Sequence, residues 1–194
     1  MKTCLLPIDF GRWLWYNIRK DNWGSLPFWR YCMDRVTKPN YYLDIAATVL
    51  KRSTCLRKRY GAIIVKNDAI VSTGYNGAPR GRDNCIELGF CVREQLKIPR
   101  GERYELCRAL HAEQNAIINA SRDQMLGATL YLVGEDSQSG TLLTDVCSCA
   151  MCKRMIINAG IDTVIIRTSP TDYNTIRVKE WVRNDDSLSG KFGY

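Results

Sequence analysis

The chain has 194 residues, of which 45% are hydrophobic and 25% are charged. This length and composition are typical of one soluble domain that can bury a core without disulfides. No apolar run approaches the roughly 18 to 20 residues of a transmembrane helix, which argues against a membrane protein. The net charge is +8, but residues 1–40 contribute 7 − 3 = +4 of it and residues 41–194 contribute 21 − 17 = +4. The mild excess of +4 outside the N-terminal segment suits a phosphate-bearing small molecule at least as well as a nucleic acid.

The N-terminal 32 residues differ in composition from the rest. They hold four of the five tryptophans, with no period of 2 or 3.6 residues, so no fold is predicted for them. Met33 reads as a plausible natural start, which leaves two alternatives: an added extension, or a segment that is not natively translated. We therefore expect an extension of unknown role at 1–32 and the folded domain at 33–194. Pro7 and Asp9 interrupt the first apolar stretch before it reaches signal-peptide length, so we expect a cytoplasmic protein.

Hydrophobic spacing predicts the first elements of the domain. Residues 41–53, "YYLDIAATVLKRS", place apolar side chains at helical spacing and end in basic residues, which indicates a helix. Residues 60–77, "YGAIIVKNDAIVSTGYNG", form two β-branched runs around Lys66-Asn67-Asp68, the pattern of a β-hairpin. A loop rich in Gly, Pro and Arg follows, and the polar residues 86–108 carry no clear pattern.

The second half of the chain alternates helices and strands. The expected order is a helix at 111–122, a strand at 128–133, a loop or small hairpin at 134–146, a helix at 149–160 closed by Gly160, and a strand at 163–167. Strands that alternate with helices predict an α/β protein built in layers.

The chain has a single histidine, His111, which opens a predicted helix together with Glu113. Cys149 and Cys152 open another helix in a Cys-x-x-Cys motif. One histidine and two cysteines are three zinc ligands, a number that leaves a fourth position open for water and so indicates catalysis rather than structure. A helix N-terminus favours the thiolate form that binds the metal. Zinc lowers the pKa of bound water to about 7, and Glu113 can lie beside that water as a proton shuttle.

Each part of this pattern has an ordinary explanation when it is taken separately. A lone histidine is usually a packed or surface residue, and a lone Cys-x-x-Cys is often a redox motif or incidental. Together and in this order they match the His-x-Glu and Pro-Cys-x-x-Cys signature of zinc nucleobase deaminases, in which the Glu is acid/base and not a ligand. Ser148 stands where that signature has proline; because serine can cap a helix, this difference should be tolerated.

Three segments together resemble the deoxycytidylate (dCMP) deaminases of the cytidine deaminase superfamily: "GAIIVKNDAIVSTGYNGAPRG", "HAEQNAIINA" and "CAMCKRMIINAGI". The resemblance covers roughly residues 41–180. It implies a three-layer α/β sandwich, with a mixed central sheet flanked by helices. It also implies hydrolysis of dCMP to dUMP and ammonia, which supplies the dTMP precursor in pyrimidine nucleotide metabolism. Water activated by zinc would attack carbon 4 of the cytosine while Glu113 protonates the ring nitrogen and then the leaving amine.

The resemblance further implies residues that bind the substrate. Asn76 in "GYNGAP" matches the family's pocket asparagine, although Asn-Gly is also a turn signal by itself. Arg122 and Arg57 are candidates for contacting the 5′-phosphate, and each can equally be a solvated surface charge. Tyr173 is a candidate for stacking on the base, although a tyrosine in a loop is more often a packing residue.

Four further cysteines would complete a closed, structural zinc site of a kind that the family often carries: Cys55, Cys85, Cys91 and Cys107. The alternative is that they are four ordinary small hydrophobic residues. Members of the family are commonly oligomers, often hexamers, and many respond to dCTP and dTTP. The resemblance therefore implies a homo-oligomer and these two effectors, neither of which is evident in the sequence itself.

Two rival functions stay open. One is deamination of another nucleobase, or of a base in tRNA or single-stranded DNA. Such an enzyme should carry a channel of basic and aromatic residues, and the sequence has no such pattern outside its Trp-rich start. The other is a noncatalytic nucleotide-binding regulator on the same fold. Glu113 argues against it, because a structural zinc needs no base beside an open position.

Overall fold

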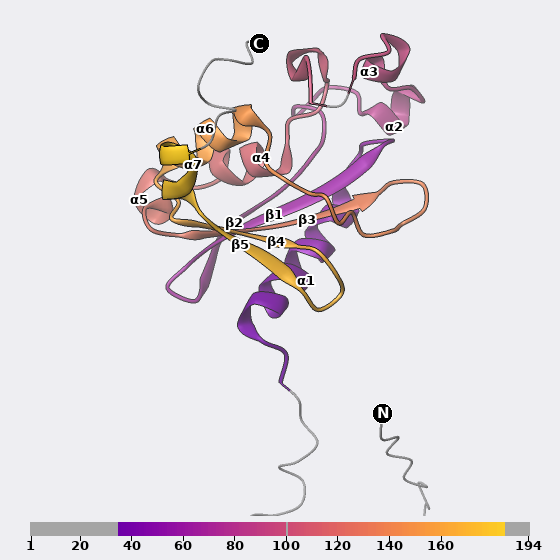
Figure 1. Ribbon diagram of the computed structural model, residues 1–194. Helices are drawn as coiled ribbons and strands as arrows, with labels where there is room; N and C mark the ends of the chain where they lie inside the picture. The colour runs from indigo at the N-terminus through magenta and orange to yellow at the C-terminus, as the bar shows by residue number, and fades with distance from the viewer. Residues whose placement is uncertain (1–34, 100, 185–194) are drawn as a thin grey trace, which may run out of the picture. The chain divides into compact units, whose positions relative to one another are not determined.

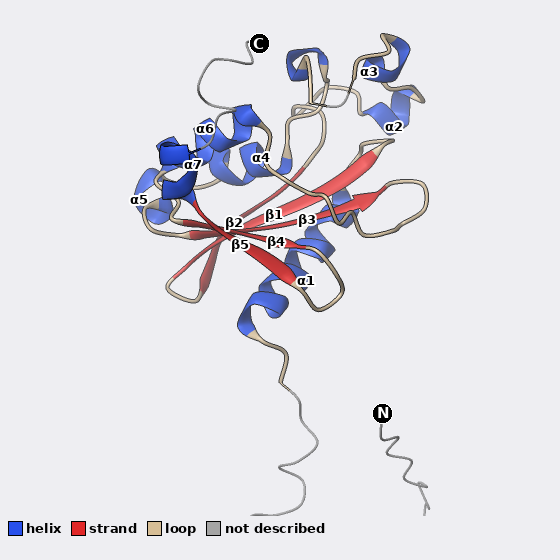
Figure 2. Cartoon of the chain, in the orientation of Figure 1, coloured by secondary structure: helices blue, strands red, loops and turns tan. Residues whose placement is uncertain are grey.

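The computed structural model describes residues 35–99 and 101–184. The predicted extension at 1–32 and its boundary with the domain lie outside the described residues. Within them, one five-stranded sheet carries helices on both faces (Figures 1 and 2). None of the described helices combines the length and apolar character needed to cross a bilayer.

The sheet is mixed, with the strand order β2-β1-β3-β4-β5. All neighbouring strands are antiparallel except β3 and β4, which are parallel. The strands span Lys58–Lys66 (β1), Ala69–Tyr75 (β2), Thr129–Asp136 (β3), Thr163–Arg167 (β4) and Tyr173–Arg177 (β5). The predicted hairpin is confirmed as β1 and β2. Asn67 and Asp68 connect them with positive φ angles of 50° and 64°, the backbone that a tight two-residue hairpin turn needs.

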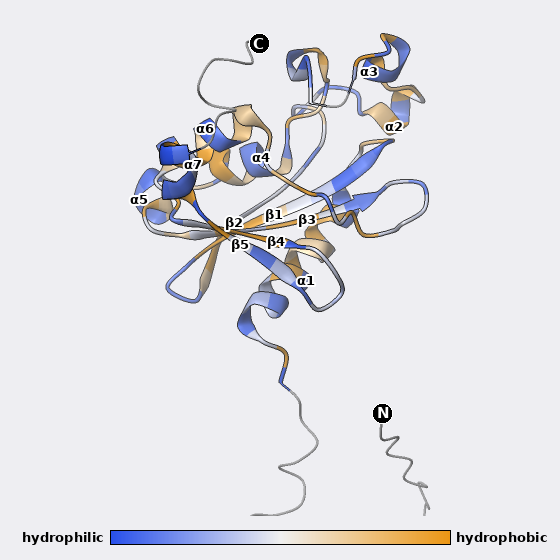
Figure 3. Ribbon diagram, viewed as in Figure 1, coloured by the Kyte–Doolittle hydropathy of each residue, from blue (hydrophilic) through white to orange (hydrophobic). Residues whose placement is uncertain are grey.

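Helices form a layer on each side of the sheet, which confirms the predicted three-layer α/β fold. On one face lies α1, whereas α4, α5, α6 and α7 pack against the other (Figure 1). Hydrophobic residues concentrate in the strands between the two layers (Figure 3). The helices span Lys38–Val49 (α1), Cys85–Leu88 (α2), Val92–Gln95 (α3), Ala112–Ile118 (α4), Arg122–Met125 (α5), Ala150–Ala159 (α6) and Val178–Asn184 (α7), with 3-10 turns at Leu50–Arg52 and Tyr104–Leu106.

The alternation of side chains along β1 decides what each residue faces. Ile63 and Val65 belong to the core under α1, whereas Ala62 and Ile64 belong to the core under α4 and α6. Successive strand residues point to opposite faces. Even-numbered positions of β1 therefore face the α4 and α6 layer, and this places Lys58 and Tyr60 on that side.

Two glycines allow helices to approach the sheet closely from its two sides. A Cβ atom on Gly61 would lie 2.1 Å from the carbonyl oxygen of Ala46 in α1. A Cβ atom on Gly74 would lie 2.3 Å from both the carbonyl oxygen of Ala112 and the amide nitrogen of Ala116 in α4. The backbone of each helix thus lies directly on the strand, and for α4 this contact sets the depth at which its first turn meets the sheet.

We expect Gly74→Ala to lower the free energy of unfolding by about 3 kcal/mol or more, because α4 must move away from β2. Thermal and urea unfolding measure this loss. Gly81→Ala is the matched control: no atom lies within 4 Å of its added Cβ, and only its φ of +81° is unfavourable. That strain should cost about 1 to 2 kcal/mol. Equal losses in the two variants would contradict the close packing of α4.

The structure differs from the sequence prediction in several places. The first helix begins at Lys38 and not at residue 41, and the short helices α2 and α3 have no predicted counterpart. The helix expected at 111–122 is two helices, because Ser121 caps a new one: its Oγ accepts a hydrogen bond from the amide of Gln124 at 3.4 Å. The strand expected to end at 133 continues to Asp136, paired with Lys58 of β1. Finally, β5 and α7 have no predicted counterpart, since β5 is an exposed edge strand without a buried alternating face.

Candidate metal and substrate site

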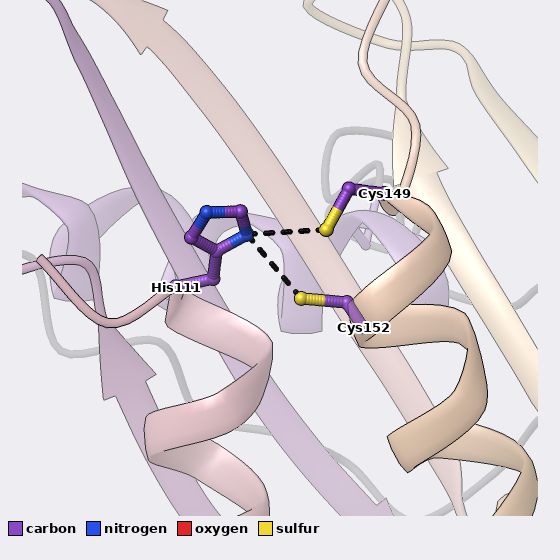
Figure 4. A group of neighbouring side chains, drawn as sticks. All are labelled: His111, Cys149 and Cys152. Carbon is purple, nitrogen blue, oxygen red and sulfur yellow. Dashed lines mark hydrogen bonds between the residues drawn. The ribbon is translucent and has the colours of Figure 1, made fainter. Parts of the chain in front are cut away.

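The first residues of two helices form the centre of the site. His111 is the N-cap of α4, where its amide donates a hydrogen bond to Oε1 of Gln114 at 2.8 Å. Cys149 is the N-cap of α6, and Cys152 follows in its first turn. Both helices pack on the same sheet face. Figure 4 shows the imidazole at the start of one helix, with its nitrogen directed at the two sulfur atoms at the start of the other.

The three side chains are arranged as zinc ligands would be. Nδ1 of His111 lies 3.4 Å from Sγ of Cys149 and 3.3 Å from Sγ of Cys152 (Figure 4). Zinc binds sulfur at about 2.3 Å and nitrogen at about 2.0 Å in a tetrahedral arrangement, which separates two such ligands by roughly 3.5 Å. In the described part of the chain this is the one group of three or more His, Cys, Asp or Glu side chains whose donor atoms all lie within 4.8 Å. The donor set and its spacing therefore fit zinc.

The two cysteines share a hydrogen bond that separates their pKa values. It lowers the pKa of the Cys149 thiol to about 4, with help from the hydrogen bond to His111 and against the effect of burial. The same hydrogen bond, followed by burial, raises the pKa of Cys152. One thiolate is thus already favoured before a metal binds, and metal binding would release the second proton.

Glu113 is the buried carboxyl group of the site. It is 5% exposed, in the first turn of α4, and it lines the same cavity as His111 and Cys149. Burial raises the pKa of this carboxyl, while the charge of His111 offsets part of the effect. A carboxyl group whose pKa is raised by burial is suited to accept and return a proton near neutral pH.

A cavity of about 130 Å³ opens beside these residues. Three of its wall residues, Lys58, Tyr60 and Leu132, come from the sheet, and Cys147 and Cys149 come from the start of α6. The segment between β2 and α4 contributes five further wall residues: Cys91, Arg93, Tyr104, Cys107 and Ala109. His111, Cys149 and the buried carboxyl of Glu113 thus line one partly open cavity together with aromatic and cationic side chains.

Tyr104 links the metal ligand to the surrounding loop. Its ring packs edge-on against the imidazole of His111, with centroids 4.8 Å apart and planes at 88°. The guanidinium of Arg93 lies over the Tyr104 ring, 4.5 Å from its centroid. Edge-to-face contact fixes the angle between two rings, so Tyr104 holds the imidazole in the orientation that directs Nδ1 at the sulfur atoms.

We expect Tyr104→Ala to weaken zinc binding by about 10-fold, since residues that orient a ligand typically contribute this much or more to metal affinity. Tyr104→Phe keeps the ring and should bind zinc like the wild type. Competition with a chromogenic zinc chelator measures both values. Equal zinc affinity in the wild type and Tyr104→Ala would show that the ring does not orient His111.

Asn76 reaches the cavity wall, but its side chain is already bonded to the protein. Its Oδ1 accepts hydrogen bonds from Oγ of Ser53 at 2.6 Å and from the amide of Tyr60 at 2.8 Å. Its Nδ2 donates to the carbonyl oxygen of Lys58 at 2.9 Å. Asn76 therefore joins the start of β1 to the end of β2, and its contact with the substrate stays a prediction.

The other predicted substrate residues are placed differently. Arg57 lines the cavity and pairs with Glu94, with Nε 3.1 Å from Oε1. Arg122 starts α5, beyond the C-terminal end of α4, and is not among the lining residues. Tyr173 lies directly opposite Arg167 on β5, and Arg167 pairs with Asp44 of α1. Opposite residues share a face, so Tyr173 faces the α1 side and not the cavity of its own chain.

The four additional cysteines lie near one another. Burial, followed by the charges of Cys55, Cys107 and Cys91, raises the pKa of Cys85. Three of them, Cys55, Cys91 and Cys107, line the cavity. Their donor atoms do not form a cluster as compact as His111, Cys149 and Cys152. The four thus lie near one another, and a zinc ion bound by them stays a prediction.

Lys58, Arg93 and Tyr104 are cavity residues that sequence reasoning missed. A period of two along β1 could have placed Lys58 on the face of the site, two residues before Tyr60. Arg93 and Tyr104 lie in the polar stretch at 86–108, where no periodicity indicated a role.

Comparison with known proteins identifies the family. The family described as "Cytidine and deoxycytidylate deaminase zinc-binding region" matches residues 36–168, which include all three proposed ligands and Glu113. The chain therefore belongs to this family. The resemblance read from the sequence motifs is confirmed at the level of the family.

Several deoxycytidylate deaminases are similar to this member of the family. The protein of Mycobacterium phage D29 is 34% identical over 138 residues, which cover 69% of this chain and 96% of the phage protein. The protein of Schizosaccharomyces pombe is 34% identical over 130 residues, covering 67% of this chain but only 37% of the yeast protein. The chain thus spans little more than a third of that relative. Among solved structures, apo dCMP deaminase from the cyanophage S-TIM5 is 29% identical with a TM-score of 0.46, over 66% of this chain and 81% of that one.

Proposed function

We propose that the chain is a zinc-dependent hydrolase that converts dCMP to dUMP and ammonia. The observation that carries this proposal is the buried Glu113 beside the His111, Cys149 and Cys152 cluster at the wall of one cavity. The choice of dCMP as substrate draws on the phage D29 deoxycytidylate deaminase, which this chain covers almost completely. A related cyanophage enzyme has been crystallised with dCMP and dUMP.

In this mechanism His111, Cys149 and Cys152 would hold a zinc ion, and zinc bound there would lower the pKa of a water molecule so that it can attack at neutral pH. The cavity holds the pyrimidine beside Glu113, whose carboxylate takes the proton from the water. Glu113 delivers this proton to N3 of the ring as the water oxygen bonds to C4. It then takes the second proton of that oxygen and passes it to the amino group, so that the C4–N bond breaks, ammonia leaves and C4 keeps the oxygen as a carbonyl. Because Glu113 is only 5% exposed, a bound pyrimidine would separate its carboxyl from bulk solvent.

Parallel assays of zinc-loaded protein with four substrates test the proposal: dCMP, CMP, deoxycytidine and a short single-stranded DNA. Loss of cytosine absorbance reports the reaction, and ammonia release checks it. We expect turnover of dCMP well above that of the other three. Turnover of the DNA alone would favour the polynucleotide deaminase, and zinc-loaded protein inert toward all four would favour the noncatalytic regulator.

We also propose a second, structural zinc bound by Cys55, Cys85, Cys91 and Cys107. Its support is that Cys55, Cys91 and Cys107 line the same cavity, and that Cys85 interacts with all three; three of the four lie in a segment with only short helices. Four thiolates make a closed tetrahedral site. Metal analysis of purified protein should then give two zinc ions per chain, and Cys85→Ser should retain one. One zinc per wild-type chain would reject this second site.

The family resemblance supports three further proposals: a homo-oligomer, with a hexamer as the expected size, regulation by dCTP and dTTP, and a cytoplasmic location. Light scattering after gel filtration gives the oligomer mass. Rates measured with each nucleotide added to dCMP test regulation. A monomer mass would reject the homo-oligomer. A rate that neither dCTP nor dTTP changes would reject the proposed regulation.

A further inference from the structure

Arg93, in the first turn of α3, is a charged residue that is only 4% exposed. A buried guanidinium is costly unless its N–H groups find acceptors. Its two terminal nitrogens donate hydrogen bonds to the carbonyl oxygens of Glu102 at 2.5 Å and Pro99 at 2.8 Å. The flat face of the same guanidinium lies over the ring of Tyr104, 4.5 Å from its centroid. Arg93 therefore ties α3 to three points of the segment that leads to Tyr104.

The backbone of this segment is strained at two residues. Lys97 has a φ of +52°, and Arg103, directly before Tyr104, has a φ of +47°. Residues other than glycine rarely adopt this left-handed conformation, and they keep it only where surrounding contacts hold them in it. The two carbonyl oxygens that Arg93 binds lie between these residues. Without those bonds the segment could relax, and Tyr104 would move with it.

The contacts of Arg93 continue to the metal ligand through Tyr104. One face of the Tyr104 ring meets the guanidinium, and the same ring packs edge-on against the imidazole of His111. A planar cation on the face of an aromatic ring restricts the plane of that ring. The edge-to-face contact then relates the plane of the imidazole to the plane of Tyr104. Arg93, Tyr104 and His111 thus form one continuous row of side chains from α3 to the N-cap of α4.

We propose that Arg93 is a positioning residue of the metal centre: through Tyr104 it fixes the imidazole of His111 in the orientation that directs Nδ1 at the two cysteine sulfur atoms. This inference rests on the proposed function, because it takes His111 as a zinc ligand. Arginine suits this role because its fork can donate to two carbonyl oxygens while its face stacks on a ring. The compact ammonium group of a lysine has no flat face to stack.

Arg93→Ala should weaken zinc binding by about 10-fold, as we expect for Tyr104→Ala. Removal of a positive charge near a bound cation would by itself strengthen binding, so weaker binding indicates a loss of orientation. Arg93→Lys keeps the charge and loses the fork, and it should also bind zinc more weakly than the wild type. Competition with a chromogenic zinc chelator measures these affinities. The affinity that belongs to this site is the one that Cys152→Ser removes.

Arg82→Ala is the matched control, because Arg82 is an exposed arginine in the same segment between β2 and α4 and does not line the cavity. It should bind zinc like the wild type. Loss of zinc affinity in Arg82→Ala equal to that in Arg93→Ala would overturn the specific role of Arg93.

A double variant shows whether Arg93 acts through Tyr104. If it does, Arg93→Ala combined with Tyr104→Ala should lose about 10-fold in zinc affinity, whereas independent effects would multiply to about 100-fold. Cobalt(II) in place of zinc gives a second measurement, since its visible absorption depends on the arrangement of the ligands. Each single variant should change this spectrum in the same way. A residue that only stabilises the loop would leave the spectrum unchanged.

The zinc and cobalt measurements need no substrate, so they separate this inference from the proposed reaction. Zinc-loaded wild-type protein without turnover of dCMP would reject the deaminase function, while weaker zinc binding by Arg93→Ala would still support the role of Arg93. Zinc affinity in Arg93→Ala or Arg93→Lys at or above the wild-type level would overturn that role, as would multiplied losses in the double variant. If Arg93→Ala does not fold, Arg93→Lys with a wild-type unfolding temperature decides the question.

Discussion

Glu113→Gln should bind zinc like the wild type and lose about 10²- to 10⁴-fold in kcat for dCMP, the usual contribution of a general acid/base. Glutamine keeps the volume of the buried side chain, so the packing at the start of α4 should survive. It cannot accept the proton of the attacking water or return it to the pyrimidine. The metal ligands are His111, Cys149 and Cys152, and none of them changes.

Metal analysis and an ammonia assay on the same preparation measure these two effects together. Glu180→Gln is the matched control, because Glu180 is an exposed carboxyl at the start of α7 and does not line the cavity. It should leave both zinc content and rate unchanged. A fully active Glu113→Gln enzyme would show that the buried carboxyl does not transfer the proton.

Cys152→Ser should weaken zinc binding by about 100-fold or more, beyond the loss expected from a residue that only orients a ligand. Cys152 is completely buried, and its sulfur lies 3.3 Å from Nδ1 of His111. Serine has nearly the same shape but offers a hydroxyl, which is not among the usual zinc ligands. Activity should fall with the metal content, since the remaining ligands are His111 and Cys149.

Cys147→Ser is the control for this change, because Cys147 is exposed and lies just before the same helix. Zinc retained after dialysis against a competing chelator distinguishes the two variants. Retention of zinc by Cys152→Ser at the wild-type level would exclude Cys152 as a ligand. Loss of zinc in Cys147→Ser would mean that the ligand set read from the structure is incomplete.

The features that sequence predicted well are those that local chemistry determines. The β1–β2 hairpin follows from two β-branched runs around a turn that Asn67 and Asp68 can adopt. The end of α6 follows from Gly160, whose φ of +77° terminates the helix. The metal cluster follows from residue types at the starts of two helices, since parallel packing on one sheet face brings those starts together.

The features that sequence missed depend on tertiary packing. The edge strand β5 has no alternating buried face, so its pattern resembled a loop, and its pairing with β4 puts Tyr173 on the side away from the cavity. The ring of Tyr104 contacts the imidazole of His111 only because the loop between these two residues brings them together.

The most direct test of the central claim is the reaction of dCMP with zinc-loaded protein in water enriched in ¹⁸O, followed by mass spectrometry of the nucleotide and measurement of ammonia. Hydrolysis at carbon 4 predicts dUMP that carries one ¹⁸O atom on the base, with one ammonia released for each dUMP formed. Recovery of unchanged dCMP from protein with zinc bound, or of a product without ¹⁸O, would contradict the account.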